Sequence, residues 1–467
     1  MTPNPKRGRL VAALAIAVLA TPNAVAAIVP SSGGTVTSTN YPINVGSALD
    51  AFDAHVSGRI ASYTANEHIR YYDFFTGVDA QVPAPVGATD LLSDVSDGRI
   101  VFTRFFGGSA TVQVFDTASA TTTEIDPQPN PVLRLGSAIG SNTVAFIDQT
   151  TNSSGELYIA GLGSNGAQRV TYDDRFDQNP NVAPDGSFAV FESCATDPSD
   201  CDIYAAIFTL SHWAPLYVST TPEPEANPDT DANLIVYDAI RLGERDIYWQ
   251  AMNGLGTEMR LELPGEQRNP SISNGIVSFE SIAPGDSTAD LFLYEIASNR
   301  LFQVTATAGL DESLNDAFVL PNGTVRAVWA QGPIADRDVR GADLVLPPAG
   351  PTYSFGGFMQ PVDARPTLNS MKAGAAVPVK FSLGGNHGMN IFAAGYPKSQ
   401  SIACDSMADV DGIETTVTAG GSSLAYDAAS ATYTYVWKTE KGWAGTCRQL
   451  VLGFADGSVQ RANFKLK

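Results

Sequence analysis

The sequence predicts an all-β protein in which a seven-bladed β-propeller, with six blades as the alternative, precedes a small β-sandwich. Two observations predict the propeller. A short strand ending in an aromatic residue recurs seven times within residues 44–346, and further strands rich in β-branched and aromatic residues follow each recurrence. A third observation predicts the sandwich: beyond a proline-rich linker at 347–351, the remaining residues carry a different set of strand patterns.

The repeating unit opens on a turn and runs into an aromatic residue, as in Val95-Ser96-Asp97-Gly98-Arg99-Ile100-Val101-Phe102. The seven anchoring aromatic residues are Tyr63, Phe102, Phe146, Phe191, Tyr237, Phe279 and Trp329. Their spacings are 39, 44, 45, 46, 42 and 50 residues. A period of about 40–45 residues with several short strands per unit is typical of propeller blades.

A second strand follows each aromatic residue, as in Asp246-Ile247-Tyr248-Trp249, and a third strand follows in six of the seven units. Asn-Gly, Asp-Gly or Ser-Gly turns separate the strands, so each unit is a β-meander. The seventh unit stops after two strands. We expect the N-terminal segment around Gly34-Thr35-Val36-Thr37-Ser38 to supply its outer strand, because ring closure removes exposed strand edges.

Residue by residue, three segments resemble the repeat of TolB-type propellers, which also builds the propeller of prolyl-oligopeptidase-family proteins, and the fourth and sixth units match it best. The matching segments are Asn179-Pro180-Asn181-Val182-Ala183-Pro184-Asp185-Gly186, Asp202-Ile203-Tyr204 and Gln168-Arg169-Val170-Thr171. The resemblance implies a TolB-like propeller over residues 28–346, although such propellers usually have six blades. It specifies the architecture better than the ligand.

The N-terminus has the pattern of a secretory signal peptide over residues 1–26. Three basic residues, Lys6, Arg7 and Arg9, precede an apolar run, and Ala24-Val25-Ala26 is a small-x-small cleavage signal. The apolar run is shorter than the roughly 18 residues that a membrane span needs, and no cysteine follows it as a lipoprotein anchor requires. We expect a secreted protein, extracellular or periplasmic, without a transmembrane segment.

The formal net charge is −21. Such acidity argues against binding to nucleic acid, whose phosphates attract lysine and arginine, and against docking to anionic lipid. It favours cations or basic partners, although most of the charge is expected to be solvated surface.

The four cysteines form two local pairs. Cys194 and Cys201 lie within one propeller unit, and Cys404 and Cys447 both lie in the C-terminal region. In an oxidising compartment, each domain would then have its own disulfide. Four cysteines allow three connectivities, and a zinc site is the alternative. Zinc is disfavoured because there is no Cys-x-x-Cys pair and only four histidines are present.

The C-terminal region reads as a compact β-sandwich. Tyr433, Tyr435 and Trp437 alternate along one strand and should share one face, and Asp456-Gly457 is a hairpin signal between the last two strands. The region closely resembles the PxKF domain of secreted bacterial proteins, through Pro378-Val379-Lys380-Phe381 and Ala393-Ala394-Gly395-Tyr396-Pro397-Lys398-Ser399. This resemblance implies an Ig-like accessory domain over residues 352–467. Lys380 is expected to point outward between buried Val379 and Phe381.

The sequence has no recognisable catalytic signature. It lacks the Gly-x-Ser-x-Gly elbow of a serine hydrolase, and its histidines are isolated from one another at His55, His68, His212 and His387. A cofactor fingerprint is absent as well, so no cofactor is predicted. Calcium is a minor alternative at Asp229-Thr230-Asp231-Ala232-Asn233, which begins like a calcium loop but lacks the glycine and distal glutamate of an EF-hand.

One repeated feature suggests a binding site. Glu192, Asp238 and Glu280 directly follow the anchoring aromatic residue in three consecutive units, and Asp148 lies one step further along in another. If this strand lines the propeller channel, these carboxylates converge near the axis and could bind a cation or a basic peptide end. The competing interpretation is that they end strands and accept hydrogen bonds from turn amides.

The sequence therefore predicts a secreted, non-catalytic binding or scaffold protein, expected to be monomeric. Its propeller face would engage an extracellular protein, peptide or glycan, and the Ig-like domain would be accessory. The alternative is an enzyme, a polysaccharide lyase or hydrolase that uses the carboxylate cluster in the channel.

Overall fold

The computed structural model describes residues 25–347 and 353–467, except for positions 47–48, 130, 165, 196–199, 210, 220, 222, 232, 242, 253–256, 394 and 405–422. Most of the predicted signal peptide lies outside these residues. Strands dominate the described chain, which has two short 3-10 helices, η1 (Ile296–Ser298) and η2 (Lys441–Trp443). Among the described residues, no helix has the length and apolar character needed to cross a membrane.

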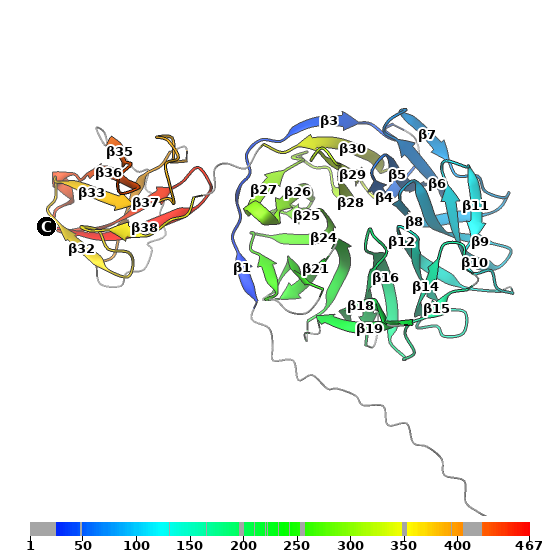
Figure 1. Ribbon diagram of the computed structural model, residues 1–467. Helices are drawn as coiled ribbons and strands as arrows, with labels where there is room; N and C mark the ends of the chain where they lie inside the picture. Colours follow the sequence, from blue (N-terminus) through cyan, green and yellow to red (C-terminus); the bar gives the residue numbers. More distant parts are fainter. Residues whose placement is uncertain are drawn as a thin grey trace, which may run out of the picture.

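Seven antiparallel sheets follow one another along the first part of the chain and form a ring (Figure 1). Sheet 1 contains β4 (Ala51–Ser57), β5 (Ile60–Ala65), β6 (His68–Asp73) and β7 (Val78–Gln81). Sheet 2 contains β8 (Thr89–Ser96), β9 (Arg99–Phe106), β10 (Ser109–Asp116) and β11 (Thr121–Glu124). Sheet 3 contains β12 (Arg134–Gly140), β13 (Thr143–Asp148), β14 (Glu156–Gly161) and β15 (Gln168–Arg169). Sheet 4 contains β16 (Phe176–Val182), β17 (Phe188–Cys194), β18 (Cys201–Thr209) and β19 (His212–Ser219).

The remaining three sheets also take up N-terminal strands. Sheet 5 contains β20 (Glu225–Asp231), β21 (Leu234–Arg241), β22 (Glu244–Ala251) and β23 (Met259–Leu261), with β1 (Ala26–Ile28) parallel to β23. Sheet 6 contains β24 (Glu266–Ser273), β25 (Ile276–Ile282), β26 (Asp290–Glu295) and β27 (Arg300–Gln303), with β2 (Ser31–Ser32) parallel to β27. Sheet 7 contains β28 (Glu312–Val319), β29 (Val325–Gln331) and β30 (Asp338–Val345), and antiparallel β3 (Thr37–Tyr41) is its fourth strand. The expectation that the N-terminal segment completes the last sheet is confirmed.

Apolar cores lie between successive sheets and explain the sequence repeat. Seven clusters of buried residues join the sheets pairwise, and each contains one of the seven anchoring aromatic residues. One of these clusters packs Tyr63 of sheet 1 against Val328 and Val339 of sheet 7. The ring is therefore closed by side-chain packing as well as by β3, and the fold is a β-propeller.

Eight of the described strands between residues 358 and 466 form two further four-stranded sheets around a single core. One sheet has the order β31 (Phe358–Met359), β33 (Ala376–Phe381), β36 (Thr432–Lys438), β35 (Ser423–Asp427). The other has the order β32 (Leu368–Met371), β38 (Val459–Leu466), β37 (Cys447–Gly453), β34 (Lys398–Ile402). As predicted, Tyr433, Tyr435 and Trp437 all face this core, and Lys380 is exposed between fully buried Val379 and Phe381.

The predicted pairing of the cysteines is confirmed. One disulfide joins Cys194 to Cys201 across β17 and β18 of sheet 4, and the other joins Cys404 to Cys447 in the C-terminal sheets. Because each bond closes a loop within one set of sheets, neither links the propeller to the C-terminal region.

Candidate functional site

A cavity of about 320 Å³ lies at the centre of the propeller, surrounded by the first strands of all seven sheets. Each sheet contributes neighbouring residues from the same place in its first strand. These are Asp53-Ala54-His55, Leu92-Ser93-Asp94, Gly136-Ser137-Ala138, Asn179-Pro180-Asn181, Asn227-Pro228-Asp229, Asn269-Pro270-Ser271 and Asn315-Asp316. The lining residues include four carboxylates and one imidazole, and neither arginine nor lysine is among them.

A β-bulge in every first strand shapes the cavity. The register between the first and second strands shifts at this place in all seven sheets. In sheets 1 to 6, the residue that opens the triplet has a positive φ, between 45° and 58°. Five of these six residues are asparagine, aspartate or glycine, the types that tolerate this conformation. A bulge bends its strand and redirects the side chains beside it.

The last residue of each triplet belongs to what we call the axial ring: His55, Asp94, Ala138, Asn181, Asp229, Ser271 and Asp316. These positions also line a smaller space of about 80 Å³ on the other side of the ring, except for Ala138 and Ser271. The ring therefore divides the centre of the propeller into two chambers. The larger chamber opens on the face where the first strands begin, which we call the pocket face.

Three ring carboxylates hold neighbouring sheets together. Asp94 accepts a hydrogen bond of 2.8 Å from the backbone N–H of Ile139 in the next sheet. Asp229 accepts one of 2.6 Å from Ile272 in the same way. Asp316 accepts one of 2.7 Å from Val56, which joins the last sheet to the first.

His55 lies among three of these acids. Its Nε2 is 3.6 Å from an Asp53 oxygen, and its Nδ1 is 3.8 Å from oxygens of both Asp94 and Asp316. Burial alone would lower the pKa of His55, but the three carboxylates together raise that pKa to about 10. The imidazole is therefore positively charged at neutral pH, and a third of its side-chain surface remains exposed.

Two ring carboxyl groups bind protons unusually tightly. Burial raises the pKa of Asp229 to about 7, and the nearby negative charge of Asp316 acts in the same direction. Burial also raises the pKa of Asp94 to about 6, although the positive charge of His55 opposes this shift. The cavity therefore holds groups that change charge near neutral pH, which is typical of functional sites but is also found in structural networks.

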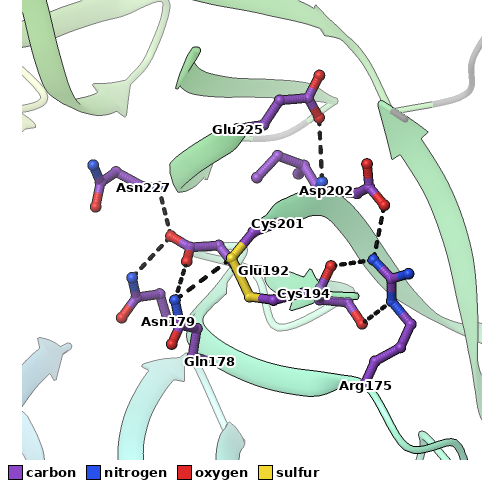
Figure 2. Close-up of a disulfide and its surroundings, with 11 residues drawn as sticks. Arg175, Gln178, Asn179, Glu192, Cys194, Cys201, Asp202, Glu225 and Asn227 are labelled. Atoms are coloured by element: carbon purple, nitrogen blue, oxygen red, sulfur yellow. Dashed lines mark hydrogen bonds and ion pairs between the residues drawn. A yellow bond between two sulfur atoms is a disulfide. The ribbon is translucent and has the colours of Figure 1, made fainter. Parts of the chain in front are cut away.

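The acids singled out in the sequence lie behind this cavity. The strand that carries them is the second in its sheet, whereas the first strand lines the centre. Figure 2 shows Glu192 accepting hydrogen bonds from the side chains of Gln178 and Asn179, at 2.7 and 2.8 Å, and from the backbone of Asn227, at 2.7 Å. Burial raises the pKa of Glu192.

The same arrangement repeats in the next two sheets. Asp238 accepts bonds of 2.8 Å from the side chain of Asn227 and from the backbone of Asn269, and it pairs with Arg245. Glu280 accepts 2.7 Å bonds from the side chains of Asn269 and Arg268. Each of these asparagines opens a triplet of the cavity, so the predicted acids position the cavity lining from behind. Asp148 lies in sheet 3, where it binds Arg134 at 2.8 Å and the Thr150 backbone at 2.8 Å.

The structure shows where the two metal sites considered from the sequence, a cysteine site for zinc and the calcium-like segment, would lie. Glu192, Cys194 and Cys201 have ligand atoms within 4.8 Å of one another, but both sulfur atoms belong to the disulfide in Figure 2. In the segment that begins like a calcium loop, Asp229 and Asp231 accept hydrogen bonds from the backbones of Ile272 and Gly275 in the next sheet. These carboxylates therefore join sheets 5 and 6.

The sequence did not single out His55 or the axial ring. A signal was present, since Asn-Pro recurs at Asn179-Pro180, Asn227-Pro228 and Asn269-Pro270. The spacings are 48 and 42 residues, and each pair precedes an anchoring aromatic residue. This recurrence marks the bulge of the first strand.

Comparison with solved structures finds propellers. The chain is similar to a prolyl endopeptidase, with 11% identity over 72% of this chain and 56% of that chain and a TM-score of 0.47. It is also similar to the propeller domain of the Trilobed protease from Pyrococcus furiosus, described as having an open velcro topology (10% identity, 63% and 93% covered, TM-score 0.47). A third similar structure is TolB from Acinetobacter baumannii (14% identity, 64% and 80% covered, TM-score 0.38).

The chain thus spans little more than half of the prolyl endopeptidase. With TM-scores below 0.5, these similarities add no argument of their own, and the propeller fold rests on the sheet order and ring closure described above. No protein-family model matches the sequence, and no curated protein matches it either.

Proposed function

We propose that this chain is an exported, non-catalytic binding protein. In this proposal, a TolB-like propeller of seven blades engages a protein, peptide or glycan through its pocket face, and a PxKF-type, Ig-like domain is its accessory. The axial cavity carries the proposal, because it lies at the centre of a closed ring, contains four carboxylates and one imidazole, and receives residues from every sheet. A concave pocket with a few convergent polar groups is the usual kind of ligand site.

The arrangement of the cavity favours binding over catalysis. The carboxylates of Asp94, Asp229 and Asp316 each accept backbone hydrogen bonds that fix neighbouring sheets, so chemistry at these groups would disturb the ring. The two disulfides are compatible with an oxidising compartment outside the cytoplasm.

An affinity experiment tests the proposal. The purified chain is immobilised and exposed to a cell-envelope extract and to peptide and polysaccharide pools, beside an Ala138→Leu variant. This change puts a larger side chain at a position that lines the cavity and also packs in the core between sheets 3 and 4, so the variant is first shown to be folded. We expect a ligand that the variant fails to retain. A soluble ligand at a hundred times its Kd should also stabilise the chain by about 2.7 kcal/mol in thermal unfolding. Equal retention by both proteins would show that the cavity is not the binding site.

A polysaccharide lyase or hydrolase is the second candidate, and one observation favours it. Asp229, with a pKa of about 7, and His55 line the same cavity, and acid–base catalysts need such values near the working pH. Glu192, Asp238 and Glu280, which the sequence suggested for this role, are buried behind the cavity and hydrogen-bonded to its asparagines. Glu192→Gln and Asp229→Asn separate the possibilities: an enzyme that uses either group loses turnover on its polysaccharide while still binding it.

A further inference from the structure

We propose that the axial cavity binds an organic cation, an ammonium or guanidinium group carried by the ligand. This inference rests on the proposed function, in which the cavity is the binding site, and it specifies the chemistry of what enters. The surroundings, the charges and the free space of the cavity each support it.

The propeller is depleted of free positive charge. Residues 25–347 contain 15 arginines and no lysine, against 41 aspartates and glutamates. All 15 arginines form ion pairs with carboxylates. No arginine is therefore left to neutralise the cavity, and the field of the propeller attracts cations.

Within the cavity, acids outnumber bases. Asp53, Asp94 and Asp316 surround His55, which compensates one negative charge among the three. Asp229, on the opposite part of the ring, accepts hydrogen bonds from neutral donors: the backbone N–H groups of Thr230 and Ile272, at 2.7 and 2.6 Å, and the hydroxyl of Ser271. Among the described residues, no arginine, lysine or histidine nitrogen forms an ion pair with it. A cationic group of a ligand would supply the positive charge that Asp229 lacks among its described partners.

Sheet 3 leaves the space that such a group needs. It contributes the small residues Gly136, Ser137 and Ala138, where other sheets carry asparagine, aspartate, histidine or proline. Ser137 is 8% exposed, and its hydroxyl has no hydrogen-bond partner among the described residues. A buried hydroxyl without a partner is costly, and a donor group of a ligand in the cavity would satisfy it.

The width of the ring favours an organic cation over a metal ion. The only described group of three or more histidine, cysteine or acidic residues whose ligand atoms lie within 4.8 Å of one another is the one at the Cys194–Cys201 disulfide. The ring carboxylates therefore do not converge on one point. A guanidinium or ammonium group on a chain can instead contact Asp229 while the rest of the ligand occupies the space beside sheet 3.

Calorimetric titration of the purified chain with blocked amino acids tests the inference. The charged probes are N-acetyl-lysine methylamide and N-acetyl-arginine methylamide, and the neutral probes of similar shape are the norleucine and citrulline analogues. We expect at least tenfold tighter binding of a charged probe than of its neutral counterpart. Putrescine, a free diamine, shows whether the natural ligand is a free amine or a peptide. If putrescine binds tenfold more tightly than the lysine probe, the ligand is a free amine. If putrescine binds more weakly than the lysine probe, the ligand is a basic side chain of a peptide.

Variants locate the site. Asp229→Asn and Ala138→Leu, which enlarges a residue that lines the cavity, should each weaken binding of the charged probe at least tenfold. Ser137→Val is the substitute if Ala138→Leu does not fold. Asp97→Asn is the matched control, because Asp97 is exposed at a turn with a φ of 50° that asparagine tolerates, and it should bind normally. Equal affinity for charged and neutral probes, or full binding by Asp229→Asn, would overturn the inference.

The outcome also separates this inference from the proposed function. Suppose that the charged probes do not bind, yet the chain retains an envelope ligand that Ala138→Leu loses. The inference of a cationic ligand is then wrong, while the cavity remains the binding site. If nothing is retained in the cavity, both proposals fall.

Discussion

Asn227 illustrates how single residues hold the propeller together. Its backbone N–H binds Glu192 of sheet 4, and its side-chain amide binds Asp238 of sheet 5. Asn227→Asp keeps a residue type that tolerates the positive φ of 53°, but it removes the donor and adds a carboxylate beside two buried ones. We expect a loss of about 2–4 kcal/mol in the free energy of unfolding at pH 8.

The loss should be smaller at pH 4. Burial beside two other carboxylates raises the pKa of the new carboxyl group in the folded state, so its destabilising effect grows as pH rises. Urea denaturation at the two pH values measures the difference. Asn66→Asp is the control, since Asn66 has a φ of 51° in an exposed turn, and its effect should stay within about 0.5 kcal/mol. A loss for Asn227→Asp that is equal at pH 4 and pH 8 would contradict the charge explanation.

Asp229 makes a prediction about pH. Its pKa is about 7 in the folded chain, raised by burial, and about 3.9 when unfolded. A raised carboxyl pKa contributes stability that is fully present below pH 4 and is lost as pH rises through 7. We expect the melting temperature to fall between pH 4 and pH 8, and Asp229→Asn to show a shallower fall. Calorimetry across this range checks it, and an unchanged slope would show that Asp229 does not titrate there.

At the scale of elements, the second, third and fourth strands of the sheets and the closing strand β3 could be predicted, whereas the first strands could not. The second strands pack an aromatic residue such as Phe191 between sheets, and this requirement leaves a clear repeat in the sequence. The first strands contain a bulge, which breaks the alternation by which a strand is recognised. Pro180 lies in such a strand because β16 is at the edge of its sheet, where a missing N–H interrupts no ladder.

The candidate site was missed for the same reason. The acids Glu192, Asp238 and Glu280 stood out because they follow the aromatic repeat, but the residues in front of them lie on bulged strands. Asp316 comes close to His55 only when sheet 7 meets sheet 1. No local pattern encodes a contact between residues some 260 positions apart.

The two disulfides should stabilise different elements. Replacing Cys194 and Cys201 together with serine opens a loop with a sequence separation of 7, which should cost about 2.5 kcal/mol. Replacing Cys404 and Cys447 opens a separation of 43 and should cost about 4 kcal/mol; both values follow from loop-closure entropy. Each pair serves as the control for the other. In calorimetry, the first change should lower the unfolding temperature of the propeller, and the second should lower that of the C-terminal sheets. If both changes lower the temperature of one shared transition, the propeller and the C-terminal sheets do not unfold separately.

At the scale of the whole molecule, the N-terminal strands should differ in what they stabilise. β1 and β2 add fifth strands to sheets 5 and 6, whereas β3 is the fourth strand of sheet 7 and places Tyr41 against Phe74 of sheet 1, with ring centroids 5.0 Å apart. Two truncations separate these effects. A chain that starts at residue 34 lacks β1 and β2, and a chain that starts at residue 42 also lacks β3.

The backbone N–H of Val56 reports on ring closure, because it donates to Asp316 across the junction of sheets 1 and 7. We expect hydrogen exchange at Val56 to be at least tenfold faster in the chain that starts at residue 42, since opening the junction exposes this amide. In the chain that starts at residue 34, exchange at Val56 should be unchanged, although the edges of sheets 5 and 6 lose protection. Equal protection of Val56 in both truncations would mean that the packing between sheets 7 and 1, with Tyr63 against Val328, holds the ring closed without β3.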